Sequence, residues 1–437
     1  MARRKRDIAG GGVIAVALVL ALASCKAEPR RWADDARSGG STVPAEAATP
    51  SERVATAVRA NELAHRFIIV DGHIDVPWRL EESRDERGDV SEDISVRTPK
   101  GDFDWERARQ GGLAAAFMSI YVPAKYEAGG AKKMADRLID LVEGFARRSP
   151  GKFALARSPS EVRANFAAGK VSLCMGMENG SPLEHRLAAV RYFHDRGIRY
   201  ITLAHSKDNH LSDSSYDDAH RNKGLSELGK QVIAEMNRLG VMVDVSHLSD
   251  DAFWQVIELS KTPVIASHSS CRHFTPGWQR NMSDEMIAAL ARRGGVIQIN
   301  FGSGFLDAEA QKRQTATFDE LEALLKRRGL SRDDKKARPI ADEFHARHPA
   351  RFATLEQVAD HIDHVKNLAG IDHVGLGSDF DGVGDTLPVG LKDVSQYPNL
   401  LRVLLERGYT EAEIEKVCSG NALRVWQAVE DYAKNTK

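Results

Sequence analysis

The sequence predicts an α/β fold of the (β/α)8 TIM-barrel type. Eight short apolar runs rich in β-branched residues alternate with longer amphipathic segments, which is typical of parallel strands joined by helices. A histidine or a carboxylate lies at the carboxyl end of six of these runs, where a parallel barrel builds its active site. The chain has 437 residues, of which 42% are hydrophobic, and this is enough for one large core.

The predicted strands follow one another along most of the chain. Their ranges are residues 67–70, 113–121, 171–177, 200–203, 241–245, 263–266, 296–301 and 374–377. Two of the intervening helices are especially regular, because their apolar residues recur every 3.6 positions. One contains Leu225, Leu228, Val232, Ile233, Met236 and Leu239, and the other contains Leu355, Val358, Ile362 and Val365. Eight such units favour a closed barrel over an open sheet.

Residues 308–351 interrupt this regularity. The segment is charged and helix-prone, as in the run DELEALLKRRG, and it lengthens the connection after the seventh predicted strand. We therefore expect a charged helical insertion in the place where a barrel can carry an active-site lid.

The N-terminus has the features of an export signal. Four basic residues at positions 3–6 precede an apolar run at 13–23, which is too short for a confident transmembrane span. The run closes with LASC, which resembles the lipobox of bacterial lipoproteins and predicts lipidation of Cys25. The alternative is an ordinary signal peptide with an incidental cysteine. We expect a signal peptide at 1–24, a flexible tether rich in Ala, Ser, Gly and Pro at 25–56, and one catalytic domain at 57–437.

Charge and cysteine content exclude some classes of protein. The formal net charge of -1 argues against a nucleic-acid-binding protein, which would show a basic excess. Besides Cys25 the chain has Cys174, Cys271 and Cys418, without a CxxC spacing, so a zinc–thiolate site is not expected. These three cysteines could form one disulfide or remain as buried free thiols, and both alternatives stay open.

The polar residues at the strand ends are those that bind zinc. In chain order they are His73 and Asp75, Glu178, His205, His247, His268 and Asp379. Zinc is bound by imidazole nitrogen and carboxylate oxygen, and two neighbouring cations need a shared anionic ligand. We expect His73 and Asp75 at one cation, His247 and His268 at the other, and Glu178 with a water-derived hydroxide between them. Asp379 would then act as general base and acid.

Other readings of the chain have less support. His361 and His364 belong to an amphipathic helix, so we expect them to pack or face solvent instead of binding metal. Asp381 is expected to orient the loop after the eighth strand. The sequence contains no GxSxG, no Walker glycine loop and no GxGxxG after a strand, so serine hydrolases, NTPases and dinucleotide-binding enzymes are not indicated.

At these residues the chain resembles the membrane dipeptidases, also called renal dipeptidases, of the amidohydrolase superfamily. The resemblance covers residues 62–429, and its motifs are VDGHIDVPW, GMENG, RYITLAHS, MNRLGVMVDVSH, PVIASHSS, QRNMSD, HVGLGSDFDGV and NALRVW. It implies two zinc ions on the five ligands named above, proton transfer by Asp379, and contact of His205 with the tetrahedral intermediate. It also implies that Arg280 binds the terminal carboxylate of a dipeptide, which suits a guanidinium fork.

The same resemblance leaves several expectations open. Family members often have a tyrosine shortly after the seventh strand, where this chain has Phe305, and residues 308–351 exceed the mammalian insertion. The family favours dipeptides, including some with a C-terminal D-residue, and leans toward homodimers. Alternatives are an amidohydrolase acting on a lactam or an N-acyl amino acid, and a non-catalytic lipoprotein that keeps the barrel as a scaffold. With a lipid anchor, the protein would face the periplasm or the cell exterior.

Overall fold

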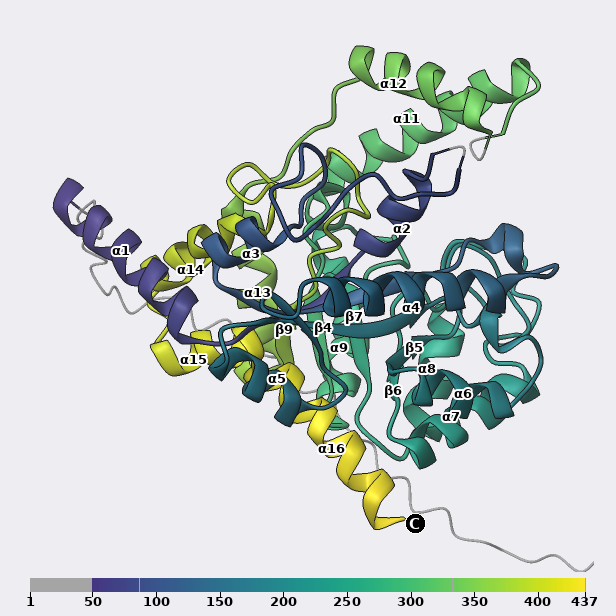
Figure 1. Ribbon diagram of the computed structural model, residues 1–437, viewed down its shortest axis with the longest axis horizontal. Coiled ribbons are helices and arrows are strands. Elements are labelled where there is room, and N and C mark those ends of the chain that lie inside the picture. The colour runs from purple at the N-terminus through teal and green to yellow at the C-terminus, as the bar shows by residue number, and fades with distance from the viewer. Residues whose placement is uncertain (1–48, 86, 332–333, 437) are drawn as a thin grey trace, which may run out of the picture. The chain divides into compact units, whose positions relative to one another are not determined.

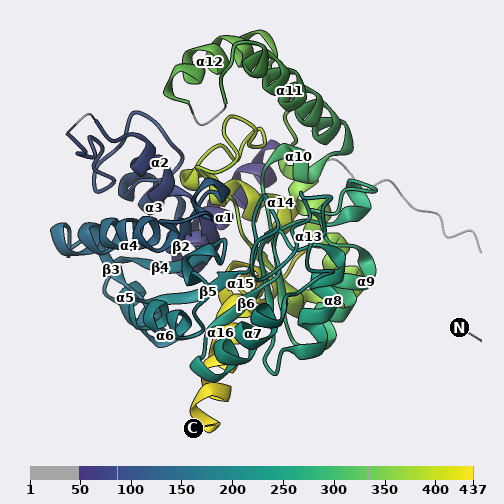
Figure 2. The ribbon, with the colours of Figure 1, turned by 90° about the vertical axis from the view of Figure 1, so that its right-hand side faces the viewer.

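A closed barrel of eight parallel strands forms the centre of the computed structural model, which describes residues 49–85, 87–331 and 334–436 (Figures 1 and 2). The barrel strands are β1 (Ile69–Ile74), β2 (Leu113–Tyr121), β4 (Val171–Glu178), β5 (Ile198–Thr202), β6 (Met242–Asp244), β7 (Ile265–Ser269), β8 (Val296–Ile299) and β9 (Val374–Leu376). Pairing of β2 with β4 and of β9 with β1 closes the ring. The predicted fold is confirmed, and β2 has the predicted bounds.

One short strand was not predicted. Strand β3 (Phe153–Leu155) pairs with the first half of β4, and β5 pairs with the second half. With three residues, β3 is too short to show the alternation by which strands are recognised in a sequence.

Helices surround the barrel (Figure 1). They are α1 (Pro50–Arg66), α2 (Val76–Glu82), α3 (Trp105–Gly111), α4 (Ala131–Arg148), α5 (Pro159–Ala167), α6 (Ala188–Asp195), α7 (Glu227–Leu239), α8 (Asp250–Leu259), α9 (Asp284–Arg292), α10 (Ser303–Leu306), α11 (Ala308–Arg327), α12 (Arg338–Arg347), α13 (Leu355–Ala369), α14 (Tyr397–Glu406), α15 (Glu411–Glu415) and α16 (Asn421–Asn435). Single turns lie at η1 (Ala124–Tyr126), η2 (Ser181–Leu183), η3 (Arg272–Phe274), η4 (Lys335–Ala337), η5 (Ile371–His373), η6 (Val394–Gln396) and η7 (Lys416–Gly420).

The two most regular predicted helices are confirmed as α7 and α13. Ser226 caps the first turn of α7, and Gly240 ends the helix in the left-handed region at a φ of 83°. Thr354 and Gln357 form a capping box at the start of α13. Such caps satisfy amide groups that the first turn leaves free, which is worth about 1 kcal/mol each.

Helix α1 corrects the predicted tether. The helix begins at Pro50, so residues 50–56 are helical although their composition suggested a flexible segment. Thr49 and Glu52 form a capping box in which the Thr49 amide donates to Glu52 Oε2 over 2.7 Å. This local signal outweighs composition, and proline at the first helical position adds to it.

The predicted export signal cannot be compared with the structure. The signal peptide at 1–24, the lipidation site Cys25 and the tether up to residue 48 lie outside the described residues. Among the helices that are described, none combines the length and the apolar character that a bilayer-spanning segment requires.

The insertion after β8, the seventh strand of the barrel, is helical, as predicted. Helices α11 and α12 project from the body in both views and enclose a small apolar cluster that includes Leu321, Leu325 and Phe344 (Figures 1 and 2). Arg338 on α12 contacts Glu82 at the end of α2 over 3.3 Å. Both side chains are exposed, so this ion pair contributes little to stability.

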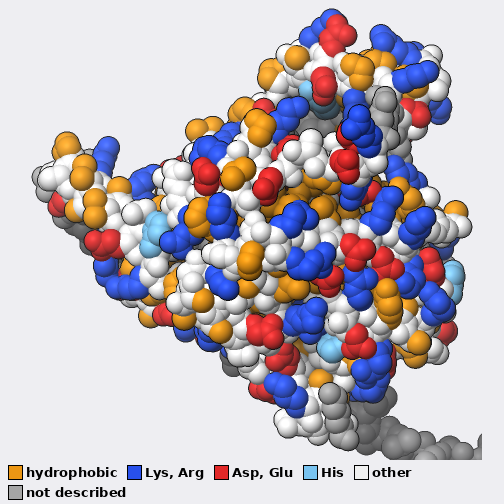
Figure 3. Space-filling view, viewed as in Figure 1, with side chains coloured by type: hydrophobic (Ala, Val, Ile, Leu, Met, Phe, Trp, Pro, Cys, Tyr) orange, Lys and Arg blue, Asp and Glu red, His pale blue; other side chains and the backbone are white. Residues whose placement is uncertain are grey.

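Three cysteines of the barrel domain are free and buried: Cys174, Cys271 and Cys418. The structure therefore favours free thiols over a disulfide. On the surface, basic and acidic side chains are interspersed over the face that Figure 3 shows.

His361 is a packed core histidine, as predicted. It is fully buried on α13, where Nδ1 accepts from the Cys271 amide over 3.0 Å and Nε2 contacts the Leu306 carbonyl over 3.2 Å. Burial lowers its pKa to about 3, so the ring is neutral. His364, one turn later, bonds to Asp284 over 2.7 Å.

Candidate metal centre

The predicted ligands meet at one end of the barrel. His73 lies in β1 with Asp75 directly after it, Glu178 ends β4, and His268 lies in β7. His205, His247 and Asp379 each follow a strand by three residues, after β5, β6 and β9. Because all eight strands run parallel, their carboxyl ends form one rim. The structure thus brings together all seven predicted histidines and carboxylates of the rim, which come from the ends of six strands.

Glu178 is the centre of this group. Its Oε1 is 3.0 Å from His247 Nε2 and 3.2 Å from His268 Nε2, while its Oε2 is 3.4 Å from His73 Nε2. His205 Nε2 is 3.5 Å from Oε1. Burial raises the pKa of Glu178, but the surrounding histidines hold it well below its usual range. A carboxylate whose two oxygens face different histidines has the geometry of a bridging ligand.

Asp75 and Asp379 form the carboxylate side of the site. His73 Nε2 is 3.3 Å from Asp75 Oδ2, and ligand atoms of His73, Asp75 and Asp379 lie within 4.8 Å of one another. Asn300 donates to Asp379 Oδ2 over 2.7 Å. Burial, together with the charge of Asp75, raises the pKa of Asp379 to about 8. No Cβ fits at Gly382, because oxygens of Asp75 and Asp379 occupy that space.

On the other side, two histidine nitrogens face each other. His247 Nε2 and His268 Nε2 are 2.8 Å apart, and burial lowers the pKa of both rings well below the ordinary value. Arg280 Nη2 is 3.0 Å from His247 Nε2. Because a guanidinium only donates, this nitrogen of His247 carries a lone pair.

The donor set fits bound cations. His73 Nε2 and Asp75 Oδ1 are buried without a hydrogen-bond partner among the described residues, which is costly unless a cation satisfies them. Neutral imidazoles and carboxylates are also the ligands that zinc prefers. The ring centroid of His268 lies 3.7 Å from that of His73, and His268 Nε2 also lies beside His247 Nε2. Because His268 is close to ligands of both predicted cations, the division of ligands between the two cations stays a prediction.

Arg280 lies beside the predicted ligands. It is 2% exposed, and it donates from Nη1 to Ser269 Oγ and from Nη2 to the His268 carbonyl, each over 2.8 Å. Its Nε has no partner among the described residues. The Phe305 ring covers the guanidinium at 5.0 Å, so an apolar face replaces the hydroxyl that the family often has there.

Aromatic rings line the approach to the site. Tyr121 packs 4.6 Å from the His205 ring, while Trp278 contacts both Phe305 and Tyr216. His205 and Tyr216 belong to the long β5–α7 connection, which reads as a polar loop. Buried carboxylates stabilise it: Asp208 accepts from the Ser214 and Arg221 amides, and Asp213 accepts from those of Asn222 and Gly224. This loop holds His205 over Glu178.

Several residues that support the site were not predicted. Tyr200 contacts His73 Nδ1 over 2.8 Å, Ser119 donates to Glu178 Oε2 over 3.1 Å, and Asn300 bonds to Asp379. Asp71 and Asp244 are fully buried inside strands β1 and β6. An aspartate within an apolar run was an available signal, because a carboxylate is buried only with partners.

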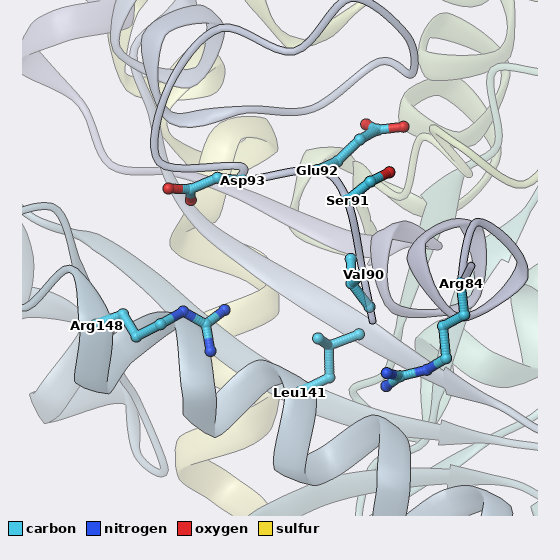
Figure 4. A pocket seen from close by; sticks show the side chains of 7 residues that line it. All are labelled: Arg84, Val90, Ser91, Glu92, Asp93, Leu141 and Arg148. Atoms are coloured by element: carbon cyan, nitrogen blue, oxygen red, sulfur yellow. The ribbon is translucent and has the colours of Figure 1, made fainter. Parts of the chain in front are cut away.

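A surface pocket lies elsewhere, between the segment after α2 and helix α4. Arg84, Val90, Ser91, Glu92, Asp93, Leu141 and Arg148 line it (Figure 4). None of these side chains belongs to the rim, so the pocket is separate from the candidate centre.

The barrel and its rim define the class of protein: a metal-dependent hydrolase. Within that class, the chain belongs to the membrane dipeptidase family, peptidase family M19, whose model matches residues 57–437. It is a metallo-dipeptidase of this family, as the resemblance predicted.

Similar proteins agree with this assignment. An uncharacterised dipeptidase of Schizosaccharomyces pombe is 32% identical over 389 residues, which cover 85% of this chain and 83% of that protein. The probable dipeptidase PvdM from Pseudomonas aeruginosa has a crystal structure that matches with a TM-score of 0.73 and 29% identity, over 87% of this chain and 100% of that one. A metallo peptidase from Rhodobacter sphaeroides, liganded with a phosphinate mimic of the dipeptide L-Ala-D-Ala, matches with a TM-score of 0.67 and 27% identity, over 83% and 99%.

Proposed function

We propose that the protein hydrolyses dipeptides with two zinc ions bound at the rim, and that it accepts dipeptides with a C-terminal D-residue. The observation that carries the proposal is the convergence of four histidine Nε2 atoms on one buried carboxylate, Glu178, at distances of 3.0 to 3.5 Å. The phosphinate-bound relative from Rhodobacter sphaeroides supports the D-residue, since its ligand mimics L-Ala-D-Ala.

Five residues would hold the two cations. His73 and Asp75 would bind one, His247 and His268 the other, and Glu178 would contact both. Zinc bound in this way polarises a carbonyl group and supplies a hydroxide nucleophile at neutral pH.

The remaining rim residues have separate tasks. Asp379 would take up a proton and return it to the leaving amine, and its hydrogen bond from Asn300 would hold one of its oxygens. His205 is 20% exposed and lies beside Glu178, where it can donate to the oxygen of the attacked carbonyl.

Arg280 would bind the free carboxylate of the dipeptide. A buried guanidinium beside the centre selects an anionic terminus, and its unpartnered Nε is available to a ligand. We expect the Arg280→Ala substitution to raise KM for free-carboxylate dipeptides by roughly 10- to 150-fold, since a hydrogen bond to a charged group is worth about 1.5–3 kcal/mol. Hydrolysis of the same dipeptides with an amide cap should change little. A panel of L,L and L,D dipeptides and their amide-capped forms, assayed with zinc-loaded protein, measures both effects.

Arg272 provides the control for this experiment. It lies on the same connection after β7, but it pairs with Asp250 and not with the rim. Arg272→Ala should leave KM nearly unchanged. Equal effects of Arg280→Ala on capped and uncapped peptides would contradict the dipeptide assignment and favour a lactam or an N-acyl amino acid as substrate.

The proposed location of the enzyme depends on the N-terminus. The basic residues at 3–6, the apolar run at 13–23 and the LASC sequence support a lipid on Cys25 that holds the protein at a membrane, facing the periplasm or the exterior. Cys25→Ser should move the enzyme from the membrane fraction to the soluble fraction with kcat unchanged, and mass spectrometry of the mature N-terminus checks the lipid. A membrane-bound Cys25→Ser variant would contradict the anchor. A homodimer stays a prediction, which sedimentation would check.

A further inference from the structure

Asp244 is a buried carboxylate with a complete set of hydrogen-bond donors. Its Oδ1 accepts from the amides of Ser246 and Ser267, over 3.1 and 2.8 Å. Its Oδ2 accepts from the hydroxyl groups of Ser267, over 2.7 Å, and of Thr202. Four donors around one carboxyl group require the ionised form, which only accepts. Asp244 therefore carries a negative charge at the end of β6, close below the rim.

The hydrogen-bond chain continues to a predicted metal ligand. Ser267 Oγ lies 2.7 Å from His268 Nδ1. Because the single hydroxyl proton of Ser267 goes to Asp244, the serine oxygen must accept a proton from His268 Nδ1. The lone pair of His268 is then on Nε2, which lies 3.2 Å from Glu178 Oε1 and 2.8 Å from His247 Nε2, which also carries a lone pair. These three electron-rich atoms repel one another unless a cation lies between them. The chain of bonds thus selects the tautomer that can bind a cation at the rim.

The other two histidine ligands lack a carboxylate partner on the Nδ1 side. His73 Nδ1 bonds to the hydroxyl of Tyr200, a neutral group whose own proton goes to the Gly72 carbonyl. His247 Nδ1 has no hydrogen-bond partner among the described residues. Among the described residues, His268 is the only one of the three histidines whose Nδ1 is connected to a carboxylate, through Ser267.

The charge of Asp244 is a second observation that connects this residue with the metal centre. The Asp244 side chain is fully buried, and no lysine or arginine forms an ion pair with it in the described part of the chain. A buried anion without a cation is costly. The path through Ser267 and His268 leads from this anion to the place where the second cation would bind.

We propose that Asp244, acting through Ser267, is a positioning residue that fixes the tautomer and orientation of His268 and thereby retains the cation of the His247 and His268 side. The inference rests on the proposed two-zinc function. Carboxylate partners of metal-binding histidines commonly have this effect, and their loss lowers metal affinity about 10- to 100-fold. Here a serine hydroxyl lies between the carboxylate and the imidazole.

The test is Ser267→Ala. This change removes the link to His268 but leaves Asp244 its bonds from Thr202 and from the two amides. We expect one of two zinc ions to be lost to a competing chelator at about 10- to 100-fold lower chelator concentration than in the wild type. The melting temperature of the metal-free protein should stay nearly unchanged.

Thr202→Val is the matched control. It removes a hydroxyl from the same carboxylate without interrupting the path to His268, so both zinc ions should be retained as in the wild type. An equal loss of zinc in Ser267→Ala and Thr202→Val would overturn the proposal, because Asp244 would then only stabilise the packing of the neighbouring strands. Wild-type zinc retention in Ser267→Ala would also overturn it. A wild-type protein that binds fewer than two zinc ions would instead contradict the proposed function.

A measurement on the unaltered chain covers the case in which Ser267→Ala fails to fold. In zinc-loaded wild-type protein with 15N-labelled histidine, the His268 signal, assigned by its loss in His268→Gln, should report a protonated Nδ1 and an unprotonated Nε2. A protonated Nε2 with a free Nδ1 would overturn the proposal.

Discussion

Glu178→Gln should remove nearly all turnover and at least one of the two zinc ions. The amide has almost the same shape as the carboxylate, but it loses the negative charge that faces His73 on one side and His247 and His268 on the other. Two cations close together need this charge between them. We expect kcat to decrease by about 10³-fold or more, which corresponds to about 4 kcal/mol of transition-state stabilisation. Steady-state kinetics and zinc analysis of the purified variant check both effects.

Glu127→Gln is a suitable control for Glu178→Gln. Glu127 is also partly buried and lies near the end of β4, where Asn179 Nδ2 contacts it over 3.4 Å, but it is not among the residues of the rim. This variant should keep two zinc ions and nearly normal kcat. If Glu178→Gln retained both zinc ions and turned over dipeptides at a rate near that of the wild type, the bridging role would be wrong.

The convergence of the candidate ligands could be predicted from the sequence because of where the strands end. Six of the eight apolar runs are followed closely by a histidine or carboxylate, and in a parallel barrel these ends meet at one rim. The prediction needed only the local pattern around residues such as His73 and Glu178. The fold supplied the long-range step, since it brings positions separated by up to about three hundred residues into contact, as in the bond from the Ser378 amide to Asp71.

The supporting residues could not be predicted in the same way. Tyr200, Asp244 and Ser267 lie inside strands, and their roles depend on partners from other strands that the sequence does not name. The pairing of Asp244 with Ser267 exists because β6 and β7 are neighbours in the barrel. A polar residue in an apolar run indicates that a partner is needed but not which residue provides it.

Backbone conformation is another property of the site that the sequence did not show. His247 and Asp379 have positive φ angles of 67° and 63°, and Asn179 next to Glu178 has a φ of 73°. Residues with a Cβ adopt this region at a cost of about 1 kcal/mol or more, and such strain is frequent at functional sites. Strands β6 and β9 are each followed by such a turn. The turns direct the His247 and Asp379 side chains toward the rim.

Asp379→Asn should separate proton transfer from metal binding. The amide can still accept from Asn300 and donate to Asp75, so the site should keep its geometry, but it can no longer take up a proton. General acid–base groups contribute about 10²- to 10⁴-fold to the rate, so we expect kcat to decrease by this factor. KM and the content of two zinc ions should change little. Kinetics with free-carboxylate dipeptides and zinc analysis of the same preparation measure the three quantities.

Asp381→Asn tests whether the effect belongs to Asp379 alone. Asp381 is two residues further along the same loop and is also buried, with a pKa that burial raises to about 7, but it contacts Arg79 and the Asp102 amide. Its role is to hold the loop, as the sequence suggested, so its replacement should lower stability while kcat changes by only a few-fold. Of the two aspartates, Asp379 is the one that lies among the ligand atoms of His73 and Asp75. A large loss of kcat in Asp381→Asn, together with a nearly active Asp379→Asn, would therefore show that the assignment of proton transfer to Asp379 is wrong.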